Sequence, residues 1–291
     1  MNIVIPAAGV GSRFLPTSRV VPKELLPFGT KPLIHHALDE AERAGFTKAL
    51  VVVSAHKKAL RMYFEPEPAL ERMLEAREDE VALALVREAA AIAQRLKLTF
   101  VEQPEPLGLG DAVLRCRPDA GECFAVLLPD DVVTSNAHWG QLLRLREQTG
   151  AACVCVREVA ADQAHRFGIA DCELTDGGLA VRELVEKPAA GRARSALAVF
   201  GRYVVTEAVL NALEAVGPRP RGELQLTDGL AAVIGRPPGV LAVRFTAEFF
   251  DNGTPEEYAR SMARYAAGAI DQWTIREKLQ QPQRLSPIGL D

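Results

Sequence analysis

Short apolar runs recur along this chain of 291 residues, and longer stretches with helical character separate them. The runs lie at 2–6, 48–54, 98–103, 123–130 and 151–159. A run that is apolar at almost every position, such as KALVVVS at 48–54, is typical of a strand covered on both faces. Because strands alternate with helices in this way in α/β proteins, we predict an α/β fold with a mostly parallel sheet.

Two later regions depart from this alternation. Residues 66–97 open with Pro66 and Pro68 and continue in Ala, Leu, Glu and Arg without turn residues, which predicts one or two helices. After Gly168 the segments become short and predict an antiparallel portion of sheet. The sequence contains no linker, internal repeat or low-complexity tract, so we treat residues 1–267 as one domain.

Local signals predict two helix starts and a distinct tail. Thr254 and Pro255 combine a cap residue with a proline at the first helical position, and a glutamate follows three residues after the cap. A helix is also expected from about Pro32 to Gly45, with Thr30 as a candidate cap. The tail at 268–291 has weak periodicity, so it is expected to be a loose helix or a contact between subunits.

Composition and charge exclude several classes of protein. Apolar residues make up 48% and charged residues 25%, which is ordinary for a globular chain, and no stretch approaches the roughly 20 apolar residues that span a bilayer. The 34 basic and 38 acidic residues give a net charge of −4, so we expect no attraction to nucleic acid or anionic membranes. No secretory signal opens the chain, and its five cysteines include no Cys-x-x-Cys pair. We therefore expect reduced cysteines in a cytoplasmic protein.

A glycine loop, Gly9-Val10-Gly11-Ser12-Arg13, follows the first predicted strand directly. Glycines allow the backbone to approach a phosphate, and the N–H groups of such a loop can face an anion. Alone the signal is weak, because Phe14 stands where a dinucleotide fingerprint has its third glycine, and a tight turn is the alternative. Lys23 follows in a segment bracketed by prolines, so the loop system carries two cations, which suits a triphosphate.

Residues 5–34 resemble the signature of the sugar-1-phosphate nucleotidyltransferases, and further blocks of that family follow in order. The blocks are QPEPLGLGDA at 103–112, LLPDD at 127–131, FGI at 167–169, VEKP at 185–188, RGELQLTD at 221–228 and FDNGT at 250–254. The segments PKELLP and QLTD, together with the helical insert, are most similar to the branch of the family that transfers uridylyl groups. Ser12 keeps the hydroxyl of the more common Thr, whereas Leu107 stands where that branch often has Lys and removes a cation near the nucleotide.

The resemblance implies a Rossmann-like, three-layer α/β fold with a mostly parallel mixed sheet and a small antiparallel portion that binds the sugar. It implies a nucleotidyltransferase domain over 1–267, with a helical insert at 66–97, and a homo-oligomer (a dimer or a tetramer) that residues 268–291 help to form. The implied reaction converts UTP and glucose 1-phosphate into UDP-glucose and pyrophosphate with Mg²⁺. The use of dTTP or CTP, or of another hexose 1-phosphate, stays open as the alternative.

The chemistry of this reaction sets what the site must supply. The attacking phosphate oxygen is already an anion at neutral pH, so the site needs positioning and positive charge rather than a general base. By the resemblance, Arg13, Lys23 and Lys187 are catalytic residues that neutralise phosphates. Asp130 and Asp251 are the implied Mg²⁺ ligands, since Mg²⁺ takes one or two carboxylates together with substrate phosphates. Without the family resemblance, the alternative interpretation is that the carboxylates cap helices or lie in solvated turns and that the cations lie on the surface.

The resemblance also assigns the residues that bind the two substrates. The nucleotide-binding residues are Ala8, Gly9, Gly11, Glu24, Gln103 and Gly108, and the sugar-binding residues are Asp131, Gly168, Glu186 and Lys187. Gln103 carries the donor and acceptor that a pyrimidine edge requires, and Gly108 lets the base approach the backbone. Without the family resemblance, the alternative interpretation is that Gln103 is a polar residue at the end of a strand and that Glu186 and Lys187 form an ion pair on the surface.

Two other classes of protein fit the sequence less well. A nicotinamide-dependent oxidoreductase needs the third glycine and an acidic residue about 20 positions further on, after a second strand, whereas Glu24 comes too early. A regulatory protein that binds a sugar nucleotide without converting it would lack one of the five residues proposed as catalytic or metal-binding. All five are present.

Overall fold

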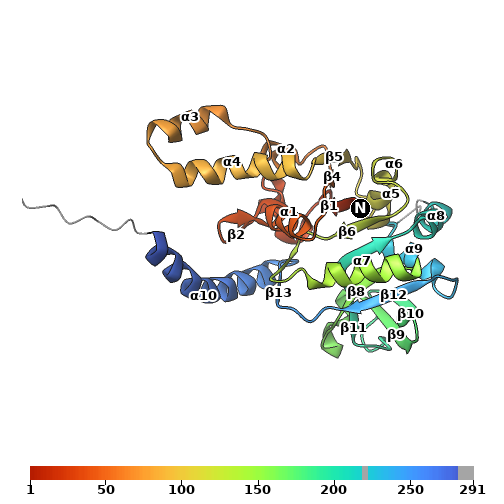
Figure 1. Cartoon of the computed structure of the whole chain (residues 1–291). Coiled ribbons are helices and arrows are strands. Elements are labelled where there is room, and N and C mark those ends of the chain that lie inside the picture. The colour runs from red at the N-terminus through yellow and green to blue at the C-terminus, as the bar shows by residue number, and fades with distance from the viewer. Residues whose placement is uncertain (218–221, 281–291) are drawn as a thin grey trace, which may run out of the picture.

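The computed structural model of the chain describes residues 1–217 and 222–280, with side chains up to Gly268. A nine-stranded sheet forms its centre (Figure 1). In their order across the sheet, the strands are β5 (Thr99–Glu102), β4 (Ala49–Val53), β1 (Ile3–Pro6), β6 (Phe124–Leu127), β11 (Leu197–Val205), β8 (Ala152–Glu158), β12 (Val240–Arg244), β10 (Gly178–Glu186) and β9 (Gly168–Thr175).

Parallel and antiparallel pairing divide the sheet. Strands β5, β4, β1 and β6 run parallel, as do β8 and β12. Strand β11 is antiparallel to both β6 and β8, and β10 is antiparallel to β12 and β9. The predicted α/β fold with a mixed sheet is confirmed. The expectation of a mostly parallel sheet is wrong in degree, because only half of the neighbouring pairs in the described chain are parallel. Two of the antiparallel pairs arise because β11 lies between β6 and β8 and runs opposite to both, and another arises because β9 and β10 form a hairpin.

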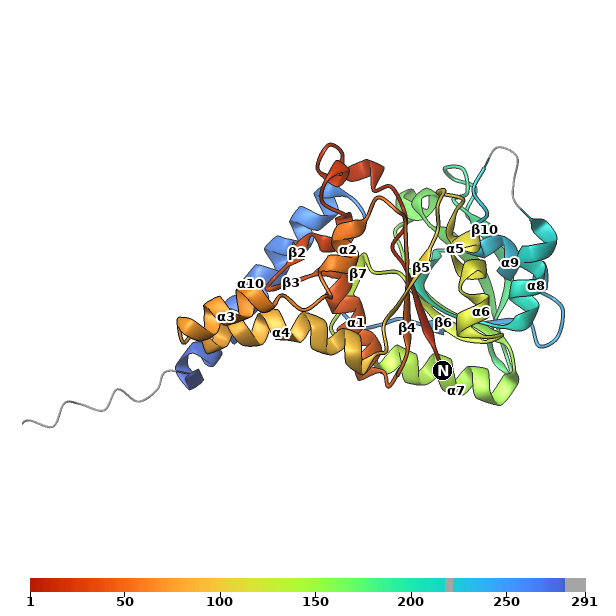
Figure 2. The same cartoon turned by 90° about the horizontal axis from the view of Figure 1, so that it is seen from above.

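Alternation along the strands buries both faces of the sheet. In β1, Val4 packs into one hydrophobic cluster, whereas Ile3 and Ile5 pack into another on the opposite face. Helices on the Ile3 face are α1 (Leu33–Arg43), α2 (Lys58–Met62), α4 (Glu80–Arg95) and α7 (Ala137–Thr149). Those on the Val4 face are α5 (Leu109–Arg115), α6 (Arg117–Ala120), α8 (Glu207–Val216) and α9 (Leu226–Val233). The three layers are visible from above (Figure 2).

The predicted insert 66–97 forms a helical hairpin. Helix α3 (Pro68–Ala76) packs on α4, where Arg87 forms ion pairs with Glu71 and Glu75. The hairpin extends away from the sheet on the same side of the molecule as α10 (Pro255–Gln280) (Figures 1 and 2). The prediction of helices here is confirmed.

The two predicted helix starts have different outcomes. Helix α10 begins at Pro255 as expected, and the backbone N–H of Glu257 donates to the Thr254 hydroxyl at 3.2 Å. Helix α1 begins at Leu33 after Pro32, and no side chain caps it, so the prediction for Thr30 is wrong. The first N–H of the helix, that of Leu33, donates to the carbonyl oxygen of Leu26 at 3.1 Å.

Helix α10 crosses the predicted boundary between 267 and 268 without a break. Residues 281–291 of the predicted tail lie outside the described residues, and the role of the tail in an oligomer stays a prediction. In the part of the chain that the structure describes, none of the helices combines the length and apolar character needed to cross a bilayer.

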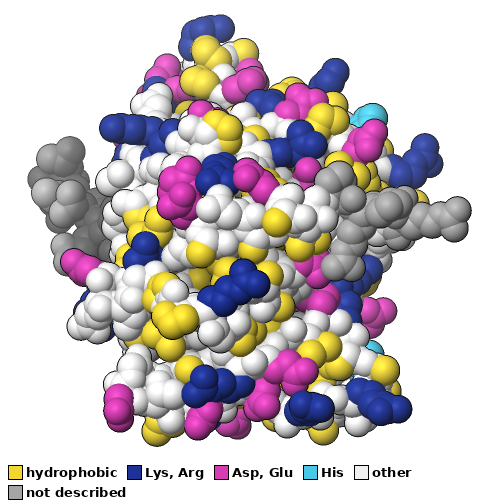
Figure 3. All heavy atoms as spheres, turned by 90° about the vertical axis from the view of Figure 1, so that its right-hand side faces the viewer, with side chains coloured by type: hydrophobic (Ala, Val, Ile, Leu, Met, Phe, Trp, Pro, Cys, Tyr) yellow, Lys and Arg dark blue, Asp and Glu magenta, His cyan; other side chains and the backbone are white. Residues whose placement is uncertain are grey.

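Surface charge and buried thiols agree with an ordinary globular chain. Acidic and basic side chains are interspersed over the face shown in Figure 3. All five cysteines are free. Burial raises the pKa of Cys116, Cys153 and Cys155 to about 12 each, so these thiols pack as small apolar groups.

Candidate active site

Two adjoining cavities open beyond the carboxyl ends of the central strands β1 and β6. The glycine-loop cavity, of about 230 Å³, lies beside the loop that follows β1, and the large cavity, of about 480 Å³, lies beside β9, β10 and β11. Their linings share Leu109, Leu128, Asp130 and Gln225. A ligand in one cavity is therefore next to a ligand in the other, with Asp130 at the junction.

The order of the parallel strands explains why the cavities form here. Strands β4 and β5 lie on one side of β1, whereas β6 lies on the other side. The loops that leave the carboxyl ends of β1 and β6 therefore diverge, and ligands bind in α/β sheets at such a point. The loop after β1 carries Gly9, and the loop after β6 carries Asp130.

Three glycines have different structural roles. An added Cβ at Gly9 would meet no atom within 4 Å, so its backbone is open to a ligand. Gly11 has a φ of +69° and turns the loop beside Lys23, but it lines neither cavity in the described structure. At Gly108, with φ +101°, a Cβ would lie 2.4 Å from the carbonyl oxygen of Leu224. Glycine is thus required at 108 by the approach of another backbone segment as well as by its conformation.

A buried lysine that the sequence analysis missed holds the glycine-loop cavity together. Lys57 is 7% exposed, and its Nζ donates to Glu24 Oε2 and to the carbonyl oxygen of Ala7, both at 2.7 Å. Burial lowers the pKa of Lys57, and the charge of Glu24 acts in the opposite direction. The only sequence signal is a lysine shortly after a buried strand, which is too common to single it out.

An ion pair joins the two strand-end loops. Lys23 Nζ lies 3.0 Å from Asp130 Oδ2. Burial alone would lower the pKa of Lys23, but the charges of Asp130 and Glu24 raise it. Burial alone would raise the pKa of Asp130, but the charge and hydrogen bond of Lys23 lower it. Both groups are therefore charged, and a cation lies at the junction of the cavities.

Carboxylates gather beside this ion pair. Asp131 and Asp251 are partners where β7 (Asp131–Val133) pairs with β13 (Phe249–Asp251). The backbone N–H and Nδ2 of Asn252 both donate to the carbonyl oxygen of Asp130, at 2.9 and 3.0 Å. Burial and the charge of Asp130 raise the pKa of Asp131 to about 8, and burial raises the pKa of Asp251 despite a hydrogen bond from the Gly253 N–H. Negative charge is thus incompletely balanced here, as expected of a site for a cation.

A fully buried arginine, Arg202, bonds the backbone of the segment that carries the aspartates. Arg202 on β11 is 0% exposed, pairs with Glu40 Oε2 at 2.6 Å, and donates to the carbonyl oxygen of Asp131 at 2.7 Å. Glu40 also accepts from Trp139 Nε1 at 2.7 Å. This ion pair was not predicted, although a single charge inside the apolar run LAVFGRYVV is a usable signal.

The large cavity contains the predicted sugar-binding residues. Lys187 Nζ lies 3.1 Å from Glu186 Oε1, and Glu186 Oε2 accepts from the Thr227 hydroxyl at 3.1 Å. A Cβ at Gly168 would lie 3.1 Å from the same Oε2, so a larger residue there would displace Glu186. Exposed Arg13 reaches the rim and donates to the carbonyl oxygen of Gly253 at 3.3 Å.

Arg157 is a further cation of the large cavity that the sequence analysis missed. Its guanidinium carbon lies 4.9 Å from the centre of the Phe167 ring and 4.5 Å from that of Phe249. Contact with two aromatic faces restricts the side chain. The sequence carries no signal for this role, because the two rings come from distant segments.

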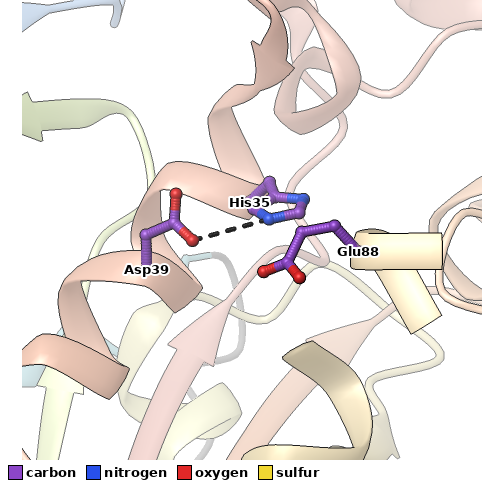
Figure 4. Close-up of side chains that lie close together, drawn as sticks. All are labelled: His35, Asp39 and Glu88. Carbon is purple, nitrogen blue, oxygen red and sulfur yellow. Dashed lines mark ion pairs between the residues drawn. The ribbon is translucent and has the colours of Figure 1, made fainter. Parts of the chain in front are cut away.

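A histidine cluster lies elsewhere. His35, Asp39 and Glu88 place possible ligand atoms within 4.8 Å of one another between α1 and α4 (Figure 4). Lys31 pairs with Asp39 at 2.7 Å, and Arg95 pairs with Glu88 at 2.7 Å. Two cations thus already balance the carboxylates of the cluster. Arg95 also pairs with Glu42 on α1, and this pair links the helical hairpin to the sheet domain.

The structure brings the predicted site residues together. Among them, Gly11 is the one that lines neither cavity in the described structure. Lining the glycine-loop cavity are Ala8, Gly9, Lys23, Glu24, Gln103, Gly108 and Asp130. Lining the large cavity are Arg13, Asp130, Asp131, Gly168, Glu186, Lys187 and Asp251. The roles given to these residues stay predictions, whereas their grouping is a finding.

Residues 2–268 match the sequence model of the nucleotidyl transferase family, and the chain belongs to this family. A protein of Staphylococcus saprophyticus named UTP–glucose-1-phosphate uridylyltransferase 2 is 38% identical over 266 residues, which cover 90% of this chain and 91% of the relative. The UTP–glucose-1-phosphate uridylyltransferase of Staphylococcus haemolyticus is 36% identical with the same coverage.

Solved structures agree with these relatives. A UDP-glucose pyrophosphorylase in complex with UDP-glucose matches with a TM-score of 0.79 and 31% identity, over 92% of this chain and 98% of that chain. A UTP-bound enzyme of the same kind from Acinetobacter baumannii matches with a TM-score of 0.81 and 30% identity, over 97% and 99%. The resemblance seen in the sequence is confirmed, and so is the α/β fold with a mixed sheet that it implied.

Proposed function

We propose that this protein transfers the uridylyl group of UTP to glucose 1-phosphate and releases pyrophosphate. The observation that carries the proposal is the pair of cavities that meet at Asp130. A transfer between two substrates requires adjacent sites with positive charge at the point of contact, and Lys23 lies there. The names of the relatives support UTP and glucose 1-phosphate as the substrate pair.

The reaction forms one phosphorus–oxygen bond and breaks another. A phosphate oxygen of glucose 1-phosphate attacks the α-phosphorus of UTP, and the bond from that phosphorus to the β-phosphate oxygen breaks. A phosphate monoester has a second pKa of about 6, so the nucleophile is ionised at neutral pH without a base. In this proposal Lys23 and Arg13 neutralise the triphosphate, and Lys187 holds the sugar phosphate.

The carboxylates of Asp130 and Asp251 fit a divalent cation, and we propose Mg²⁺. Incomplete charge balance around Asp131 and Asp251 supports this choice, as does the all-oxygen set of donors. A bound Mg²⁺ would supply positive charge to the phosphates. Asn252 and Arg202 fix the backbone of this segment, so the carboxylates need little rearrangement to bind the ion.

The remaining binding residues divide between the two substrates. Ala8, Gly9 and Glu24 are proposed to hold the nucleotide, with Gln103 and Gly108 at the base. Glu186 is proposed to accept hydrogen bonds from sugar hydroxyls, with Asp131 and Gly168 beside it. A cytoplasmic location and a homo-oligomer are part of the same proposal.

The test is a panel of four nucleoside triphosphates against four sugar 1-phosphates, with pyrophosphate release as the readout. The highest kcat/KM is expected for UTP with glucose 1-phosphate in the presence of Mg²⁺. A higher value for dTTP or CTP, or for another hexose 1-phosphate, would replace the proposed pair by the alternative within the family.

A further inference from the structure

The carboxamide of Gln103 has a fixed orientation in the glycine-loop cavity. Its Nε2 donates to the carbonyl oxygen of Gly108 at 3.0 Å and to Asp111 Oδ2 at 2.7 Å. A carbonyl and a carboxylate only accept hydrogen bonds, so the amide nitrogen, not the oxygen, must face them. Gln103 is 4% exposed, which leaves little room for another rotamer.

Gln103 therefore offers a ligand an acceptor and no donor, whereas the sequence analysis expected both groups to face the base. Both hydrogens of its amide are used inside the protein. Within the described chain, no residue donates to Oε1, and Gln103 lines the cavity. A base that presents an N–H to Oε1 of Gln103 can form a hydrogen bond with it. A base that presents an acceptor there leaves two lone pairs facing each other, which is unfavourable. Uracil has an N–H at N3, and cytosine has a lone pair at the same position.

Asp111 fixes the orientation of the Gln103 amide, because its carboxylate accepts a hydrogen bond only from the amide nitrogen. It lies in the first turn of α5, within the block 103–112, and accepts a hydrogen bond from Gln103. Arg115 Nε donates to the same Oδ2 at 2.7 Å and holds the carboxylate in place. With Asn at 111, the side chain could offer either a donor or an acceptor. The Gln103 amide could then turn over, and only the Gly108 carbonyl would oppose the turn.

We propose that Asp111 is a positioning residue that sets base preference by fixing the Gln103 carbonyl toward the base. The favoured substrates are nucleoside triphosphates whose base has an imide N–H, and cytidine triphosphate is disfavoured. This inference rests on the proposed function, because it requires the nucleotide base to occupy the glycine-loop cavity.

The experiment compares Asp111→Asn with Arg115→Gln in the full chain. Both variants remove the ion pair between positions 111 and 115, but only the first removes the acceptor-only partner of Gln103. For each variant, kcat/KM is measured with UTP and with CTP at saturating glucose 1-phosphate. We expect Asp111→Asn to lower the ratio of UTP to CTP about 10-fold or more, since one unmatched buried hydrogen bond is worth about 10- to 100-fold. Arg115→Gln is expected to keep the ratio within about threefold.

Two further measurements separate positioning from folding. Asp111→Glu keeps a carboxylate, so it should restore most of the ratio that Asp111→Asn loses. In Asp111→Asn the KM for UTP should rise while the KM for glucose 1-phosphate stays unchanged, which a general loss of structure would not produce. If Asp111→Asn turns over too slowly, calorimetric binding of UTP and CTP gives the same ratio.

The outcomes also distinguish the inference from the function on which it rests. Wild-type protein without uridylyltransferase activity would remove the proposed function. Wild-type activity with an unchanged ratio in Asp111→Asn, or with an equal loss in Arg115→Gln, would overturn the role of Asp111 and leave the function intact.

Discussion

Replacing Lys57 by Met tests how the glycine-loop cavity is held in shape. The substitution keeps most of the side-chain volume but removes the ammonium that bonds Glu24 and the Ala7 carbonyl. Glu24 is only 2% exposed, so its carboxylate would be left without a counter-ion inside the protein. Breaking a buried ion pair at one end costs about 3–5 kcal/mol of unfolding free energy. At 2–4 °C per kcal/mol, the melting temperature should fall by about 6–20 °C.

Circular dichroism melts of Lys57→Met, Glu24→Gln, the double variant and Lys58→Met provide the assay, because a coupling energy requires both single variants. Lys58→Met is the matched control, because that neighbouring lysine is exposed, and its effect should stay within about 0.5 kcal/mol. Lys57→Met combined with Glu24→Gln removes both charges, so it should be more stable than Lys57→Met alone, with a coupling of about 2 kcal/mol or more. The KM for UTP should rise about 10-fold or more in Lys57→Met, since Ala7 and Glu24 shape the loop that is proposed to hold the nucleotide.

Two results would refute this reasoning. One is a melting temperature for Lys57→Met that equals that of Lys58→Met, which would mean that the ion pair adds no stability. The other is strict additivity in the double variant, which would mean that the unpaired Glu24 carboxylate is not the source of the loss.

Three other perturbations have expected outcomes. Lys187→Ala should lower turnover and raise the KM for glucose 1-phosphate about 10- to 100-fold, with a smaller change for UTP; equal changes for both would contradict its role at the sugar phosphate. Asp130→Asn should lose about 100-fold or more of the Mg²⁺-dependent rate while its circular dichroism stays native, and an active variant would remove Asp130 from the metal site. Burial acts to raise the pKa of Glu40, but Arg202 and His138 lower it to about 2, below the ordinary 4.5. The stability from its ionisation, about 3 kcal/mol, is therefore complete above pH 4.5 and lost as the pH falls toward 2. Urea unfolding from pH 6 to pH 2.5 should show a shallower loss in Glu40→Gln than in wild type, and parallel curves would contradict the assignment.

Local sequence signals predicted the elements that depend on local physics. The apolar run at 48–54 became β4, and the Thr254–Pro255 signal became the start of α10. The hairpin from the insert also followed from composition, because helix formers without turn residues have few other conformations. Pairing direction was less predictable, since β11 lies between β6 and β8 through contacts distant in sequence.

The candidate site was predictable where a motif carries the chemistry. The glycine loop, Asp130, Lys187 and Gln103 lie where motif order implied. The groups that position them were harder to predict, because Lys57 acts through partners that only the fold brings near, and Arg202 stood out only as a charge within an apolar run. Gly108 shows the same limit, since its sequence gave no sign that the Leu224 backbone approaches it.

The most direct measurement of the central claim is a crystal structure of the protein with UDP-glucose. The claim is that the two halves of the product occupy two cavities that meet at Asp130. Electron density is predicted for uracil beside Gln103, for the diphosphate beside Asp130, and for the hexose beside Glu186 and Lys187. An ordered ligand with its base in the large cavity, or bound outside both cavities, would contradict the account.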